Sequence, residues 1–382
     1  MLEAQSRLLL NPSLGPERLA RLQRARVAIV GAGTLGGHVV PHLSMLGIGL
    51  TVVDPGAVEA VNLGAQMLPV ASVGALKAEV RADQARAFNR DCQVRVEPSR
   101  VEELGVASLA DCDLVVGGLD SRLSRLYVNR VLAQQLGKPW IDAALDGSGE
   151  FLLGSVSVFD PTKPEAACYG CRFDESALER IRLEEGTSGC PSWRADDVPI
   201  TPPTLSISPL AAIVAGHQTL MALRVLLGED LGGTQLLITA DGTPRVRSTR
   251  LERNPSCPFH VERLAPLRMF QGETVAELLK AASRELRGEP EGLLFHRQLA
   301  LGLRCDRCSE ARRMPRAVQS YGDSDVTCRC GGDLVPTATE RHLHGNDLKE
   351  LLPRSFSDLG LPRADVVSAT RGNDAAHFIV NP

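Results

Sequence analysis

The sequence of 382 residues lacks a strong excess of either charge, because 42 Lys and Arg stand against 46 Asp and Glu, for a net charge of −4. It therefore lacks the electrostatic footprint of a protein whose main partner is a nucleic acid or an anionic membrane. The first residues contain no basic segment that leads into an apolar one, so no secretory signal is predicted. These absences make the cytoplasm the expected compartment.

An uninterrupted apolar segment of membrane-spanning length is also missing. The most apolar stretch, residues 205–228, contains His217, Gln218 and Arg224, and an arginine alone costs about 3 kcal/mol at a bilayer centre. We predict a buried helix there. The composition, 43% hydrophobic and 23% charged, is that of a folded chain with room for about two or three domains.

Short apolar runs alternate with helix-forming segments in the first part of the chain. The predicted strands are 26–30, 50–54, 93–96 and 113–119, and the predicted helices follow Gly36 and cover 75–89 and 122–136. This alternation predicts an α/β fold with a Rossmann-like, mostly parallel sheet. Later strand patterns at 151–159, 235–240 and 244–250 have no helix between neighbours and predict an antiparallel extension, with a helix at 210–227 packed on it.

The pattern changes again near Ala265, where we place a domain boundary. Residues 1–265 are predicted to form the first domain. Residues 266–382 are predicted to form a smaller one, with helices at 274–286 and 346–352, a strand at 293–303 and a cysteine-bearing segment.

Glycines 31, 33 and 36 form a G-x-G-x-x-G motif between the first predicted strand and helix, and Asp54 ends the next strand. The first glycine permits a tight turn, the second lets the backbone approach phosphate, and the third lets helix pack on strand. Phosphate would sit at the helix N-terminus. Asp54 would hold the ribose of NAD, FAD or ATP equally well, so the motif predicts a nucleotide without selecting one. A glycine turn used only for packing is the alternative.

The chain has ten cysteines, and most of them occur in pairs. Intracellular thiols stay reduced, so the pairs indicate metal or catalysis. Cys168 with Cys171 and Cys257 with His260 form two ligand pairs that predict one structural zinc site. A second site, like a zinc ribbon, is predicted from four further cysteines, with His342 or His344 as alternatives to the last of them: Cys305, Cys308, Cys328 and Cys330.

Taken together, these motifs resemble the ThiF/MoeB/HesA adenylyltransferases and the ubiquitin-activating enzymes that share their fold. The resemblance covers about residues 1–262. In chain order it rests on residues 6–10, the glycine loop, Asp54, residues 62–66, Lys77, Asp120 and the two halves of the first zinc site.

The resemblance implies attack of a protein's C-terminal carboxylate on the α-phosphate of ATP, which gives an acyl-adenylate and pyrophosphate. Both reactants are anionic, so the site needs cations. The resemblance assigns phosphate binding to Lys77, magnesium binding to Asp120, and nucleotide contacts to Asn62 and Gln66. Without such a function, Lys77 would be a solvated lysine on a helix, and Asp120 would be the N-cap of the next helix.

The chain departs from the family pattern at two positions. Ala65 replaces the arginine of the family's Asn-Leu-x-Arg-Gln motif, and Gly56 replaces a second acid. Arg81 is a candidate to take over the lost phosphate contact. Arg7 matches an arginine that family members supply from the neighbouring subunit, which implies a homodimer with composite sites.

Cys190 lies in a stretch like the family's crossover loop, where a cysteine receives the activated acyl group. Our preferred hypothesis is therefore adenylation of the C-terminal glycine of a ubiquitin-like protein, followed by thioester formation at Cys190. A conjugating enzyme would then be a partner, with the second domain as its docking site. The alternatives are a sulfur-carrier protein adenylyltransferase and sulfurtransferase, a catalytically silent scaffold, and an NAD-dependent dehydrogenase.

Overall fold

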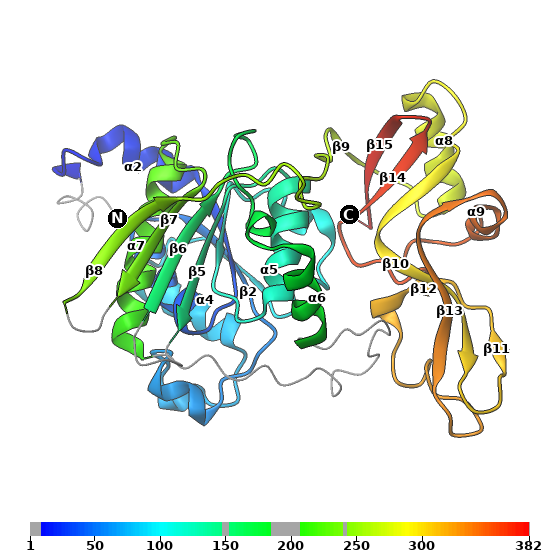
Figure 1. Ribbon diagram of the computed structural model, residues 1–382, viewed down its shortest axis with the longest axis horizontal. Coiled ribbons are helices and arrows are strands. Elements are labelled where there is room, and N and C mark those ends of the chain that lie inside the picture. Colours follow the sequence, from blue (N-terminus) through cyan, green and yellow to red (C-terminus); the bar gives the residue numbers. More distant parts are fainter. Residues whose placement is uncertain (1–8, 147–152, 185–206, 240–242, 382) are drawn as a thin grey trace. The chain divides into compact units, whose positions relative to one another are not determined.

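The computed structural model describes residues 9–146, 153–184, 207–239 and 243–381 (Figure 1). Its internal contacts divide these residues into two compact units. The first comprises residues 9–102, 109–184 and 207–263, and the second comprises residues 103–108 and 264–381, within the described parts of the chain.

The first unit is built on an eight-stranded sheet of order β3-β2-β1-β4-β5-β6-β7-β8. Figure 1 shows β5, β6, β7 and β8 side by side. From β3 to β5 neighbouring strands are parallel, and from β5 to β8 they are antiparallel. This confirms the predicted α/β class and the antiparallel extension. The strands are β1 Arg26–Val30, β2 Gly49–Val53, β3 Val94–Glu97, β4 Leu114–Gly117, β5 Trp140–Asp146, β6 Leu153–Phe159, β7 Thr234–Thr239 and β8 Arg245–Arg250.

The central strands β2 and β4 are buried along their whole length, because helices cover both faces of a parallel sheet. Crossovers between parallel strands are right-handed, so α3 and α4, which lead from β1 through β2 to β3, lie on one face. The crossover from β4 to β5 runs the other way and places α5 on the opposite face. The helices are α2 Gly15–Arg24, α3 Thr34–Met45, α4 Lys77–Phe88, α5 Arg122–Val128, α6 Glu175–Glu184 and α7 Ser208–Leu226.

Helix α7 confirms the buried helix predicted from the apolar stretch. By length and composition alone it could cross a membrane. However, Leu210, Val214 and Met221 are buried in the core that α7 shares with α3 and strands β5 and β6. Its hydrophobicity is explained by this packing.

The helix predicted for 122–136 is confirmed, but its second half is not α-helical. Helix α5 ends at Val128, and Asn129–Gln135 forms a π-helix (η4). The wider turn shows in the hydrogen bond from Leu136 N to Val131 O at 3.0 Å, five residues back. The side chain of Asn129, which is fully buried, turns toward the segment that carries Cys168.

The second unit is a separate α+β structure with its own core. Its sheet runs β11-β10-β14-β15-β9, with β12 and β13 also paired to β10. Phe295, Phe356 and Phe378 pack in the core with α8, whose N-terminus carries a capping box of Thr274 and Glu277. The elements are β9 Leu267–Met269, α8 Val275–Glu285, β10 Gly292–Cys305, β11 Ala311–Arg312, β12 Arg316–Ala317, β13 Leu334–His344, α9 Gly345–Leu351, β14 Asp365–Arg371 and β15 Asp374–Val380.

A buried ion pair fastens residues 103–108 into this second unit. Arg297 Nε lies 2.7 Å from Asp365 Oδ2, and the two side chains are 5% and 1% exposed. Asp365 Oδ1 accepts the backbone N–H of Val106 at 3.0 Å, and the guanidinium of Arg297 donates to the carbonyl of Leu104. A segment from between β3 and β4 therefore completes a unit built mainly from residue 264 onward.

We expect Asp365→Asn to lower the free energy of unfolding of the second unit by about 3–5 kcal/mol, because Arg297 would remain buried with an uncompensated charge. Urea unfolding of the full chain measures this effect. Asp374→Asn, at an exposed position on the neighbouring strand β15, is the matched control. An Asp365→Asn midpoint equal to that of the control would contradict the expectation.

Candidate nucleotide and metal sites

The predicted nucleotide residues meet at the carboxyl ends of the parallel strands. Strand β1 is followed by β2 on one side, whereas β4 lies on its other side. The chain order therefore reverses between β1 and β4, and open α/β sheets bind ligands at such a switch point. The glycine loop follows β1, Asp54 follows β2, and Asp120 follows β4.

Three glycines at this edge pack directly on one another. A Cβ atom on Gly36 would lie 2.0 Å from the carbonyl oxygen of Gly31, and one on Gly118 would lie 2.8 Å from the same oxygen. Gly31 also has a φ of +90°, which favours glycine. At Gly33 the nearest atom to a Cβ would be Gln66 Nε2, at 3.7 Å. The backbone of Gly33 thus faces space that a phosphate could enter.

The carboxylate of Asp54 holds the glycine loop against β2. Oδ2 accepts the backbone N–H of Ala32 at 2.7 Å, and Oδ1 accepts that of Gly56 at 2.7 Å. Each oxygen keeps a lone pair with which it could accept a ribose hydroxyl.

The segment after β2 supplies the two predicted amide side chains. Asn62 lies in the 3₁₀ helix η1 (Ala60–Gly64), where its Oδ1 accepts the backbone N–H of Glu59 at 3.0 Å. Gln66 lies beside Gly33, and its buried Oε1 has no hydrogen-bond partner. A buried acceptor without a partner is costly, so a donor on a bound nucleotide would satisfy Gln66.

Lys77 is the first residue of α4 and is half-buried. A cation at a helix N-terminus is disfavoured by the helix dipole, which argues against an ordinary surface lysine. A Cβ on Gly56 would lie 3.3 Å from Lys77 Nζ and 3.0 Å from Asp54 Oδ1. The ammonium group therefore lies at the nucleotide edge, and the missing side chain at Gly56 gives it room.

Asp120 is exposed at the carboxyl end of β4. The N-cap of α5 is its neighbour Ser121, whose Oγ accepts the backbone N–H of Ser124 at 3.1 Å. Asp120 is therefore not the N-cap of α5, because Ser121 has that role. An exposed carboxylate beside the glycine loop is a suitable ligand for magnesium.

Arg81 does not replace the arginine lost at Ala65. It is 1% exposed and donates to the backbone carbonyls of Ala32 and Gln66, with Ala32 O at 3.1 Å. Burial lowers the pKa of Arg81 to about 10, so it remains charged at neutral pH. Its role is to tie the glycine loop to the segment that carries Gln66.

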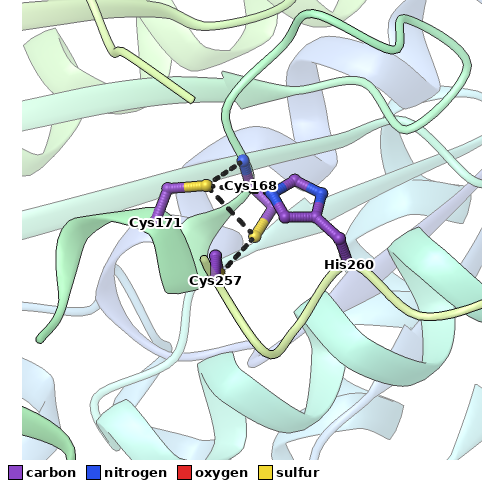
Figure 2. A group of neighbouring side chains, drawn as sticks. All are labelled: Cys168, Cys171, Cys257 and His260. Atoms are coloured by element: carbon purple, nitrogen blue, oxygen red, sulfur yellow. Dashed lines mark hydrogen bonds between the residues drawn. The ribbon is translucent and has the colours of Figure 1, made fainter. Parts of the chain in front are cut away.

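Cys168, Cys171, Cys257 and His260 converge from two distant segments (Figure 2), with their ligand atoms within 4.8 Å of one another. The Cys168 Sγ atom lies 3.7 Å from the Sγ atoms of both Cys171 and Cys257, and Cys171 Sγ lies 3.1 Å from His260 Nε2. Sulfur ligands about 2.3 Å from a tetrahedral zinc would lie about 3.8 Å apart. Burial raises the pKa of Cys168, a cost that a bound cation would offset.

The second cluster joins Cys305 and Cys308, at the end of β10, to Cys328 and Cys330, before β13. The Sγ atoms of Cys305 and Cys330 lie 3.5 Å apart, and those of Cys308 and Cys328 lie 3.6 Å apart. Backbone N–H groups, chiefly that of Cys308, lower the pKa of Cys305 to about 7 and favour the metal-binding thiolate. Cys330 therefore completes this donor set, while His342 binds Thr370 Oγ1 at 3.0 Å.

Two predicted site residues, Arg7 and Cys190, lie outside the described residues. Cys92 and Cys112 are buried, as expected for packed small hydrophobes. Burial raises the pKa of Cys112 to about 11, which suppresses its reactivity.

Two arginines organise the site; the sequence suggests Arg81 only as a phosphate contact and does not single out Arg125. Arg81 is 1% exposed and the side chain of Arg125 is 12% exposed, and both bind backbone carbonyls of the loops at the sheet edge. Nothing in helical periodicity distinguishes such an arginine from a solvated one. The only signal is position, since Arg125 follows Asp120 by five residues and therefore faces back toward the strand end.

Solved structures with the same fold include E. coli MccB bound to MccA-N7isoASN. It superposes with a TM-score of 0.53, at 20% sequence identity, over 68% of this chain and 75% of that one. The two chains therefore share a fold.

This chain aligns with most of the length of two known proteins. The SAMP-activating enzyme E1 of Haloferax volcanii is 32% identical over 266 residues, 67% of this chain and 88% of that protein. The sulfur carrier protein adenylyltransferase of Thermus thermophilus is 34% identical over 265 residues, 67% and 90% of the two chains. Fold, site and relatives together define an E1-like adenylyltransferase. The ThiF family profile matches residues 5–259, and the chain belongs to the ThiF family.

Proposed function

We propose that the protein uses Mg–ATP to adenylate the C-terminal glycine of a small ubiquitin-like sulfur-carrier protein. One observation carries the proposal: the glycine loop, Lys77 and an exposed Asp120 share one sheet edge at the switch point. A dehydrogenase would need only the loop and an acid.

The residues have distinct roles in this reaction. Backbone N–H groups at the start of α3 bind phosphate, and Lys77 neutralises charge as the carrier's carboxylate attacks the α-phosphorus and pyrophosphate leaves. Asp120 holds the magnesium ion, which screens the triphosphate when bound. Gln66 and Asp54 fix the nucleotide from the side of β2. The first cysteine cluster holds zinc as a structural ion.

We propose that a sulfur donor receives the acyl group of the adenylated carrier. The sequence alone favours a thioester at Cys190 for conjugation, but two relatives are named for a sulfur carrier and for sulfurtransfer. The Haloferax relative is named an activating enzyme E1, so thioester formation for conjugation remains the second candidate. In both cases the same acyl-adenylate forms first.

The test is ATP–pyrophosphate exchange by the full chain, with a small carrier protein ending in Gly-Gly. We expect exchange that requires both magnesium and the carrier, and none when the carrier's last glycine is deleted. A scaffold would show no exchange, and a dehydrogenase would bind NADH in preference to ATP in a fluorescence titration. Mass spectrometry of the wild type and Cys190→Ala, with ATP and the carrier, then shows whether the carrier becomes linked to Cys190.

A further inference from the structure

The loop that carries Asp120 begins where strands β4 and β5 part. The last pair of their parallel ladder is Gly117 with Asp142, and beyond it β4 ends whereas β5 continues alongside β6. Residues 117–119 lead from this fork to Asp120. Because Asp120 itself is exposed, the position of its carboxylate depends on how these preceding residues are held.

A buried glutamine of α7 lies at the fork. Gln218 is fully buried in a helix whose other buried residues are mostly apolar. Its Nε2 donates to the carbonyl oxygens of Gly117, at 2.7 Å, and Ile141, at 3.0 Å. Its buried Oε1 has no hydrogen-bond partner, which is costly. An apolar side chain would avoid that cost, so the use of Gln218 lies in the two strand ends that its amide group joins.

Arg125 holds the end of the same loop from the other face of the sheet, since α7 packs on α3 and α5 lies opposite α3. Its Nη2 donates to the carbonyl of Leu119, the residue directly before Asp120. The guanidinium is anchored on β5, where Nε donates to Asp142 Oδ1 and Nη2 to the carbonyl of Ala143, both at 3.2 Å. Closing α5 on β5 requires only the contacts with β5. The bond to Leu119 therefore serves the loop.

The glycines between these two anchors are held by the sheet. The N–H of Gly118 donates to Val30 O at 2.8 Å. The backbone of Gly117 lies against Trp140, because a Cβ atom on Gly117 would be 2.7 Å from the indole Nε1. Each of the three residues before Asp120 is thus bonded to a group outside the loop, which restricts the positions that the carboxylate can take.

We propose that Gln218 and Arg125 are positioning residues for magnesium binding, which clamp the loop from opposite faces of the sheet and so place the Asp120 carboxylate. This inference rests on the proposed function and deepens it. Magnesium demands near-ideal octahedral geometry, whereas calcium accepts flexible coordination. A small displacement of the carboxylate should therefore weaken Mg–ATP binding more than Ca–ATP binding, and should leave the binding of metal-free ATP unchanged.

The decisive variant is Gln218→Met, which keeps an unbranched side chain of similar length and removes both hydrogen bonds. Calorimetry on the full chain measures the dissociation constants of Mg–ATP, of Ca–ATP and of ATP without a divalent ion. We expect Mg–ATP to bind about tenfold more weakly, the usual effect of losing a group that orients a metal ligand. Ca–ATP binding should weaken less, and ATP alone should bind as it does to the wild type.

Gln235→Met is the matched control, because it removes another buried glutamine from the same sheet. Gln235 Nε2 donates to Ser157 Oγ at 3.0 Å, between β7 and β6. This variant should bind all three ligands like the wild type.

A second variant tests the other anchor. Arg125→Lys keeps a positive charge beside Asp142 but loses the planar group that reaches β5 and Leu119 at once. It should also weaken Mg–ATP binding more than Ca–ATP binding. Arg224→Lys, in an exposed pair with Glu229, is its control and should bind like the wild type. Where Gln218→Met does not fold, Arg125→Lys decides.

The outcomes separate this inference from the function on which it rests. Suppose that the wild type binds Mg–ATP and exchanges pyrophosphate. If the two variants then bind Mg–ATP equally well, or bind Mg–ATP, Ca–ATP and ATP alone with the same loss, only the positioning role is overturned. If the wild type binds no Mg–ATP, the positioning role and the proposed function both fail.

Discussion

Replacement of Lys77 by alanine is expected to reduce pyrophosphate exchange by a factor on the order of 10²–10³, the usual cost of removing a group that stabilises developing charge. Asp120→Asn should produce a similar loss, because the amide keeps the shape of the side chain but removes the charge that holds magnesium. Both side chains lie at the sheet edge outside the hydrophobic core. Their loss should therefore leave the thermal unfolding temperature nearly unchanged.

Two matched variants control this experiment. Lys280→Ala removes an exposed lysine from α8, and Asp83→Asn removes a carboxylate from α4 whose side chain is 80% exposed. Exchange rates for both should equal that of the wild type. If Lys77→Ala retained more than half of the wild-type rate, the assignment of Lys77 to the phosphates would be wrong.

Adding one methyl group to Gly36 is expected to destabilise the first unit, whereas adding it to Gly33 is not. The Cβ of Gly36→Ala would meet the Gly31 carbonyl at 2.0 Å, and overpacking of a rigid backbone contact costs about 3 kcal/mol. Gly33→Ala meets nothing closer than 3.7 Å, but its methyl group would occupy the space that the phosphate enters. Gly33→Ala should therefore fold normally and bind Mg–ATP at least tenfold more weakly.

Thermal unfolding and ATP titration of the two variants together check this expectation. The opposite pattern, a stable Gly36→Ala and an unstable Gly33→Ala, would contradict the description of the glycine loop. Normal ATP binding by Gly33→Ala would show that phosphate does not approach this backbone.

The parallel sheet and the glycine loop could be predicted because their signals are local. A strand such as Arg26–Val30 is a short apolar run, and the turn after it needs glycines at fixed spacing. Strand β5 and helix α6 were not predicted. The first contains buried Asp142, which pairs with Arg125 from another part of the chain, and the second has just a weak amphipathic pattern.

The two cysteine clusters were predicted as groups because pairs of ligands keep their spacing in the sequence. The fourth ligand of the second cluster could not be chosen, since Cys330, His342 and His344 are all within reach along the chain. Register decides the choice: His342 and His344 lie on β13, paired with Leu294 and Gly292, so their positions are set by the sheet. Contacts such as Arg81 with Gln66 depend on tertiary structure alone.

The placement of residues 103–108 in the second unit affects how this protein can be divided. Cutting the chain at residue 264 would remove most of the second unit, in which Gly105, Val106 and Ala107 are buried, and would expose these residues to solvent. It would also leave Asp365 without the backbone donor supplied by Val106. The second unit therefore depends on two separate segments of the chain. Adding or removing the C-terminal segment alone, by a single gene fusion, would leave the loop before β4 without its packing partner.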